Sequence, residues 1–151
     1  MPGGAPGAGD LQVNAMNTND NQNPTHTDND SISEHVIQDL RGLSSDDPDG
    51  FLVELIDLFQ TDAEEYLARI DAAATATDAS VVRKNAHGLK GSSGNLGAKT
   101  MSSLCHQIEI AASEVAPNWN VIHPILVSLV AEAARVKQAL AQRRQQAIQP
   151  K

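Results

Sequence analysis

Residues 86–109, AHGLKGSSGNLGAKTMSSLCHQIE, are the most informative part of the sequence. They hold a histidine and a lysine one helical turn apart, glycines at three-residue intervals, and a second apolar segment with its own histidine and glutamate. Glycine inside a helix costs roughly 1 kcal/mol relative to alanine, so a purely structural helix would not favour several of them. The stretch therefore predicts a helical hairpin that carries a functional site. Its candidate residues are His87, Lys90, Gly91, Gly94, His106 and Glu109.

The first helix of this hairpin, expected over residues 79–95, has an apolar stripe and an open face. The stripe is predicted to face the core, at about 100° per residue, and consists of Val82, Ala86, Leu89, Ser93 and Leu96. His87 lies about 140° from that stripe and Gly91 lies on the far side, so His87 is predicted to be exposed. Because Gly91 has no side chain, another molecule's backbone could approach the imidazole closely. The residues around them are Arg83, Lys84, Lys90 and Gly94.

The second helix, expected over residues 98–115, turns two polar residues to one edge. Its apolar stripe is Met101, Leu104, Cys105, Ile108, Ala112 and Val115, and Ile110 points outward. In an antiparallel hairpin that turns near Leu96 and Gly97, His87 is level with His106, and Glu109 lies within about one turn of it. A carboxylate that accepts a hydrogen bond from one imidazole nitrogen fixes the tautomer and makes the other nitrogen more nucleophilic.

The remaining helices follow from capping residues and breaks. A short helix capped by Ser33 should end at Gly42, and a long one should begin with Asp47 as its cap and Pro48 in its first turn. Asp78 should cap the helix that carries His87. A last helix, with Asn118 as its cap, is expected over residues 119–143, and Pro124 predicts either a bend there or a regular part that begins near His123. Its inward residues are predicted to be Val121, Ile122, Ile125, Leu126, Leu129, Val130, Val136 and Leu140.

Composition bounds the fold and the class of function. Hydrophobic residues make up 40% of the chain and aromatic residues only 3%, which is typical of an all-α domain rich in Leu, Ile, Val and Ala. Residues 1–31 are rich in Gly, Pro, Asn and Asp and are predicted to form a disordered leader. One helical domain is expected over residues 32–143, and residues 144–151 are expected to fray.

Charge and apolar patterning exclude several partners. The net charge of -8 argues against nucleic-acid binding, which needs a basic surface. The sequence contains no run of 18 apolar residues, so no membrane span is predicted. Cys105 is the only cysteine, so an intrachain disulfide is impossible and a reducing, cytoplasmic setting is expected.

Two other kinds of site are disfavoured by spacing. The segment GSSGNLGAKT superficially suggests a phosphate-binding loop, but Ala98 separates Gly97 from Lys99 and no strand precedes it. A di-metal bundle site needs paired Glu-x-x-His motifs, whereas this chain has only His106 and Glu109 in the reversed order. No metal or cofactor of its own is therefore predicted.

The stretch resembles the histidine-containing phosphotransfer (HPt) domain family. The family pattern AHxLKGSSxxLGA…L…LE is matched by His87, Leu89, Lys90, Gly91, Ser92, Ser93, Leu96, Gly97, Ala98, Leu104 and Glu109. The resemblance covers residues 32–140. The spacing from His87 to His106 and Glu109 also resembles the phosphotransfer domain of chemotaxis histidine kinases. Gly88 and Gly94 are extra glycines that depart from the family pattern, and they leave the exact C-terminus of their helix unspecified by the resemblance.

The resemblance implies an antiparallel up-and-down four-helix bundle with a short extra N-terminal helix. Its exposed histidine, His87, would accept a phosphoryl group from an aspartyl phosphate on a receiver domain and pass it to another, while Mg²⁺ would belong to the receiver. Lys90 would lie near the phosphoryl group, Glu109 and His106 would support the imidazole, and the protein would be a monomeric carrier instead of an enzyme. The predicted docking residues are Arg83, Lys84, Gly91, Gly94 and Ile110. The alternative is a helical adaptor of the same fold that binds a partner independently of His87.

Overall fold

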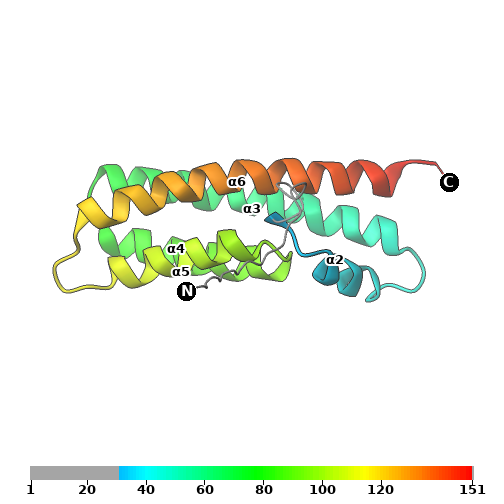
Figure 1. Ribbon diagram of the computed structural model, residues 1–151, viewed down its shortest axis with the longest axis horizontal. Helices are drawn as coiled ribbons and strands as arrows, with labels where there is room; N and C mark the ends of the chain where they lie inside the picture. The colour runs from blue at the N-terminus through cyan, green and yellow to red at the C-terminus, as the bar shows by residue number, and fades with distance from the viewer. Residues whose placement is uncertain (1–30, 151) are drawn as a thin grey trace, which may run out of the picture.

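Five helices and their connections make up residues 31–150, the part of the chain that the computed structural model describes. They are α2 (Glu34–Arg41), α3 (Pro48–Thr75), α4 (Ala79–Asn95), α5 (Lys99–Ala112) and α6 (Trp119–Ile148). The all-α prediction is confirmed, because these residues contain no strand. The four longer helices run alternately up and down as an antiparallel bundle (Figure 1).

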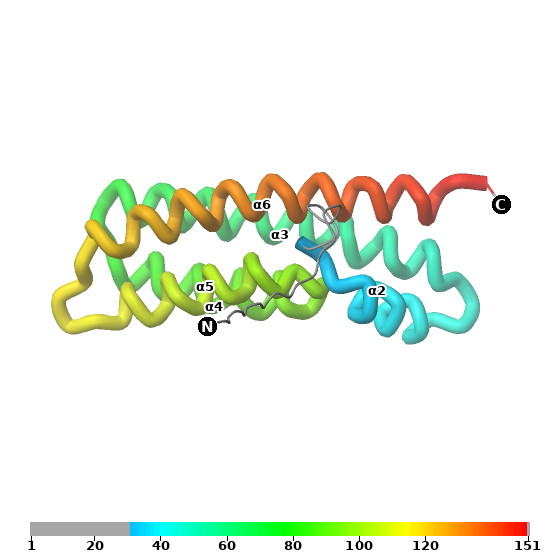
Figure 2. The backbone as a smooth tube through the Cα atoms, in the orientation of Figure 1, coloured from blue at the N-terminus to red at the C-terminus, as the bar shows by residue number. Residues whose placement is uncertain are grey.

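The bundle has two layers of unequal length. The long helices α3 and α6 form one layer, and the shorter hairpin of α4 and α5 covers only part of it (Figure 2). Helix α2 lies beyond the turn of this hairpin and packs against α3. The backbone N–H of Ser33 donates to the carbonyl of Gly97 across 2.9 Å, which ties α2 to the hairpin turn. Gly97 has a φ of +83°, and a Cβ there would lie 2.9 Å from Val36, so the turn requires glycine.

Local signals placed the helix starts correctly. The four predicted caps each accept a hydrogen bond from a backbone N–H in the first turn, and they are Ser33, Asp47, Asp78 and Asn118. Pro48 occupies the first helical position of α3, where its missing N–H leaves no bond unmade. The predicted core stripe of α4 is buried at every position. Ile56 of α3 is also fully buried.

Several predictions at the helix ends are wrong. Helix α5 ends at Ala112 rather than 115, so Val115 is fully exposed instead of buried. Helix α6 begins at Trp119 and includes Pro124, which rules out a regular part that begins near His123. Two residues expected to face inward on α6 are exposed, Val121 by 49% and Val130 by 62%.

Helix α6 also continues to Ile148, so residues 144–148 do not fray as predicted. Arg144 forms a two-pronged contact with Asp57 of α3, with Nε to Oδ1 at 2.8 Å and Nη2 to Oδ2 at 3.2 Å. Arg143 pairs with Glu34 of α2. These contacts hold the last turns of α6 against two other helices, and a helical pattern in the sequence does not reveal them.

The domain begins earlier than predicted. The predicted leader includes Ser31, yet both Ser31 and Ile32 are buried. The rest of the predicted leader, residues 1–30, lies outside the described residues. Within residues 31–150, no helix combines the length and the apolarity that crossing a bilayer requires.

Candidate functional site

His87 stands on the open face of α4, as the helical wheel predicts. Its neighbours Ala86 and Leu89 are fully buried and fix the rotation of the helix, so the His87 side chain is 65% exposed. On the flank of α4 that faces α5, Lys90 follows one turn later. The imidazole is therefore open to an approaching molecule.

Glu109 of α5 joins His87 and Lys90. One carboxylate oxygen, Oε2, lies 2.8 Å from Nδ1 of His87, and the other, Oε1, lies 2.8 Å from Nζ of Lys90. The hydrogen bond from Lys90 is the largest cause that lowers the pKa of Glu109; partial burial opposes it, and the hydrogen bond from His87 adds to it. Glu109 is consequently ionised at neutral pH.

The ionised carboxylate decides which imidazole nitrogen carries the proton. A carboxylate only accepts hydrogen bonds, so Nδ1 of His87 must be the donor across this 2.8 Å contact. In the neutral ring, Nε2 then keeps its lone pair. Since the side chain is mostly exposed, Nε2 is the nitrogen available as a nucleophile.

His106 does not share this arrangement equally. Its Nδ1 lies 3.9 Å from Oε1 of Glu109, beyond hydrogen-bonding distance, and its side chain is exposed. The predicted pair of supporting residues is thus unequal in the structure: Glu109 touches His87, and His106 stands at the edge of the site.

The matched family and fold agree with this geometry. The Hpt domain family model matches residues 54–148. The chain belongs to the Hpt domain family. The crystal structure of histidine-containing phosphotransfer protein B (HptB) from Pseudomonas aeruginosa PAO1 is similar, with 28% sequence identity and a TM-score of 0.67 over 77% of this chain and 96% of that one. No curated protein sequence gave a match. Hpt domains carry phosphoryl groups on histidine in phosphorelays and are not conventional enzymes.

The glycines of this Hpt domain have three different environments. A Cβ added at Gly91 would meet no atom within 4 Å, so that position is open to solvent beside His87. At Gly88 it would lie 2.6 Å from the ring of Tyr66 on α3, and at Gly94 it would lie 3.4 Å from Oγ of Ser102 on α5. Gly88 therefore serves close packing, and Gly94 faces a side chain of its own domain as well as solvent.

Hydroxyl groups brace the glycine-rich half of α4. Ser102 of α5 donates its hydroxyl to the carbonyl of Lys90 across 2.9 Å. The buried Ser93 hydroxyl reaches the carbonyls of Leu89, at 2.7 Å, and of Lys90, at 3.2 Å. These bonds support the helix where glycines weaken it, and α4 continues to Asn95 as the sequence predicted. The predicted site residues do not include Ser102 or Tyr66, although each faces α4 across a three-residue turn and hairpin alignment could have placed both beside it.

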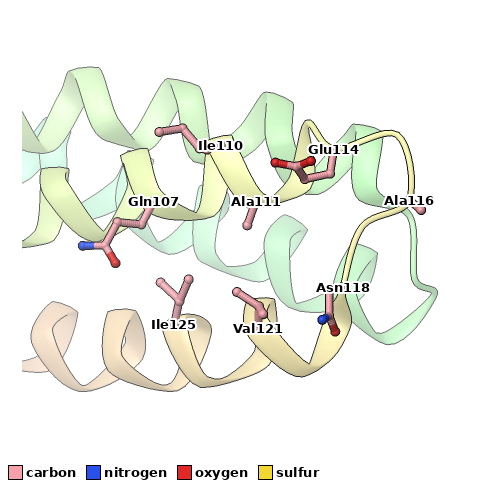
Figure 3. Close-up of a pocket in the computed structure, with 8 residues that line it drawn as sticks. All are labelled: Gln107, Ile110, Ala111, Glu114, Ala116, Asn118, Val121 and Ile125. Atoms are coloured by element: carbon pink, nitrogen blue, oxygen red, sulfur yellow. The ribbon is translucent and has the colours of Figure 1, made fainter.

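The surface around His87 is cationic on one side and apolar on another. Arg83 and Lys84, one turn before His87, are exposed and form no ion pair with any residue from 31 to 150. Ile110 is 53% exposed and lines a hollow between α5 and α6 with Val121 and Ile125 (Figure 3). Ile110 also borders a second hollow that contains Lys90, His106 and Glu109. The apolar hollow therefore reaches the edge of the histidine site.

The described part of the Hpt domain offers no evident metal centre. Across residues 31–150, no three His, Cys, Asp or Glu side chains lie where they could hold one ion. Cys105 is buried, and burial raises the pKa of its thiol to about 12. The cysteine is thus a packing residue, and the polar chemistry of the site rests on His87, Lys90 and Glu109.

Proposed function

We propose that this Hpt domain is a phosphorelay intermediate in which Nε2 of His87 accepts a phosphoryl group from a receiver domain and transfers it to another. The observation that carries the proposal is the 2.8 Å contact between Nδ1 of His87 and the Glu109 carboxylate on an otherwise exposed imidazole. That contact supports an unprotonated Nε2 directed away from Glu109. The family membership supports the same chemistry.

The proposed transfer needs no group that the two proteins lack. The Nε2 lone pair attacks the phosphorus of the receiver's aspartyl phosphate, an N–P bond forms, and the P–O bond to the aspartate breaks and leaves its carboxylate on the receiver. The positive charge that develops on the imidazole is stabilised by the Glu109 carboxylate at Nδ1. In the onward step, a carboxylate oxygen of the second receiver attacks phosphorus and the N–P bond breaks.

Lys90 has two proposed tasks. In the unphosphorylated domain its ammonium group pairs with Glu109 at 2.8 Å and keeps the carboxylate ionised. Because it lies one helical turn after His87, it is also close enough to turn toward a phosphoryl group on Nε2. Its side chain is 30% exposed, so this change of partner requires only rotation of the lysine chain.

The proposed docking face surrounds His87. Gly91 provides clearance, Arg83 and Lys84 provide positive charge for the acidic pocket of a receiver, and Ile110 provides apolar contact. Gly94, exposed on the same helix, extends the face towards the hairpin turn. The receiver supplies Mg²⁺, and this chain acts as a cytoplasmic monomer without a cofactor of its own.

Phosphoryl transfer from a labelled receiver tests the proposal. A receiver domain phosphorylated on aspartate with radioactive phosphate would be mixed with the wild-type protein and with His87→Gln and His106→Gln variants. Acid-labile label should appear on the wild type and on His106→Gln, and be absent from His87→Gln. Absence of label on the wild type with several receivers, or equal label on His87→Gln, would favour the adaptor function instead.

A further inference from the structure

We propose that Tyr66 of α3 is a positioning residue for His87, which it supports through the backbone of Gly88. The inference rests on the proposed function of His87 as the phosphoryl acceptor. Tyr66 is half-buried and packs against the core, and it has no place in the transfer chemistry described above. Its contact with α4 occurs at the residue directly after the reactive histidine.

The contact depends on the absence of a side chain at Gly88. A Cβ at Gly88 would lie 2.6 Å from Cε1 of Tyr66 and 2.7 Å from both Cζ and the hydroxyl oxygen. Such distances are shorter than any van der Waals contact, so no other residue fits at position 88 while the ring keeps its place. The outer end of the ring therefore lies directly on the α4 backbone beside His87.

The two neighbouring helices hold this turn of α4 from opposite flanks. On the flank towards α5, Glu109 binds the His87 and Lys90 side chains at 2.8 Å each. Gly88 and Lys90 lie about 160° apart on the helical wheel, so the ring of Tyr66 supports the other flank. His87 projects between the two supports, which add to the burial of Ala86 and Leu89 in fixing its rotation about the α4 axis.

Loss of the ring would leave one flank unsupported. Gly88 and Gly91 have no side chains to pack on this turn of α4, so beyond the buried Ala86 and Leu89 its position depends on what neighbouring helices place against it. A small rotation of this turn would lengthen the contact between Nδ1 of His87 and Glu109. Tyr66 thus acts on the imidazole without touching it.

A double-mutant cycle between Tyr66 and Gly88 tests the assignment. Tyr66→Ala should slow phosphoryl uptake by about tenfold, as expected when a reacting group is misplaced by a fraction of an ångström, and Tyr66→Phe should remain close to the wild type because it keeps the ring. Gly88→Ala should slow uptake in the wild-type background by displacing the ring, and should cause little further loss when Tyr66 is already alanine.

The imidazole spectrum provides a readout that does not depend on transfer. In the unphosphorylated protein, ¹⁵N and ¹H shifts of the His87 ring report the tautomer and the hydrogen bond to Glu109. They should change in Tyr66→Ala and Gly88→Ala, and be restored in Tyr66→Phe. Leu126→Ala, which truncates a half-buried residue of α6, is the control for general loss of stability and should leave these shifts unchanged.

Three results would overturn the assignment. They are an unchanged ring spectrum in Tyr66→Ala, equal slowing by Leu126→Ala at matched thermal stability, and additive effects of Gly88→Ala and Tyr66→Ala. If the wild-type protein takes up no phosphoryl group, the proposed function fails by itself. The ring spectra would still decide whether Tyr66 positions His87.

Discussion

Substitution of Gly91 should raise the stability of the domain and lower its rate of phosphoryl uptake, so it distinguishes an effect on docking from an effect on folding. A Cβ at this position meets no atom within 4 Å. Replacing a glycine inside a helix by alanine should therefore stabilise the domain by about 1 kcal/mol. For a domain of this size the melting temperature should rise by roughly 3 to 6 °C. Arginine is nearly as good a helix former as alanine, so Gly91→Arg should show most of the same gain.

Phosphoryl transfer should respond in the opposite way. In Gly91→Arg a long side chain stands one helical turn from His87, on the face proposed for receiver docking, and uptake should slow by at least about tenfold, equivalent to about 1.4 kcal/mol. Gly91→Ala should show a smaller loss. Melting followed by circular dichroism gives the stability, and quenched-flow labelling from a phosphorylated receiver gives the rate.

Ala131→Arg, at an exposed position of α6, is the matched control for added length and charge and should transfer at the wild-type rate. A Gly91→Arg protein that is stable and transfers as fast as the wild type would refute the proposed docking role of Gly91. A fall in melting temperature for Gly91→Ala would refute the finding that a Cβ at position 91 meets no other atom.

Three further predictions concern the site and its surroundings. Lys90→Met should raise the pKa of Glu109 towards its ordinary value of 4.5, because the hydrogen bond from Lys90 is the largest cause that lowers it. Carboxyl ¹³C titration by NMR measures this pKa, and an unchanged value would show that Lys90 does not keep Glu109 ionised. In the wild type the pKa of Glu109 is lower in the folded protein than its ordinary value of 4.5, so its stabilising contacts are complete above pH 4.5. They are lost as the pH falls through the pKa of the folded protein, and thermal melts between pH 3 and 7 should show this loss of stability. Cys105, with its thiol pKa raised to about 12 by burial, should react with a thiol reagent only on unfolding; rapid reaction of the folded protein would contradict its burial.

Local chemistry made much of the fold predictable. Caps such as Asp47 and Asp78 bond to N–H groups three residues away, so their neighbours in sequence determine them. The buried stripe of α4 is narrow, and the helical wheel placed His87 correctly on the opposite face. Glu109 could be placed next to His87 because a short hairpin turn leaves little freedom in how α4 and α5 align.

The wrong or missing predictions share a dependence on how helices pack. Val121 and Val130 belong to a wide apolar arc on α6, and only the positions of α3 and α5 decide which part of that arc is buried. Tyr66 is the exception, because it lies opposite Gly88 across the short turn of residues 76–78 between α3 and α4, and hairpin alignment could have paired the two. The last turns of α6 are held by the pair between Arg144 and Asp57, which are far apart in the sequence.

The central claim is that Nε2 of His87 carries the phosphoryl group. Phosphorus–nitrogen coupling in an NMR spectrum of the ¹⁵N-labelled, phosphorylated protein identifies the nitrogen directly. Because Nδ1 donates its hydrogen to Glu109 at 2.8 Å, the coupling should appear at Nε2 of His87 alone. A phosphoryl group on Nδ1 of His87, on His106, or on no histidine of the protein would contradict the account.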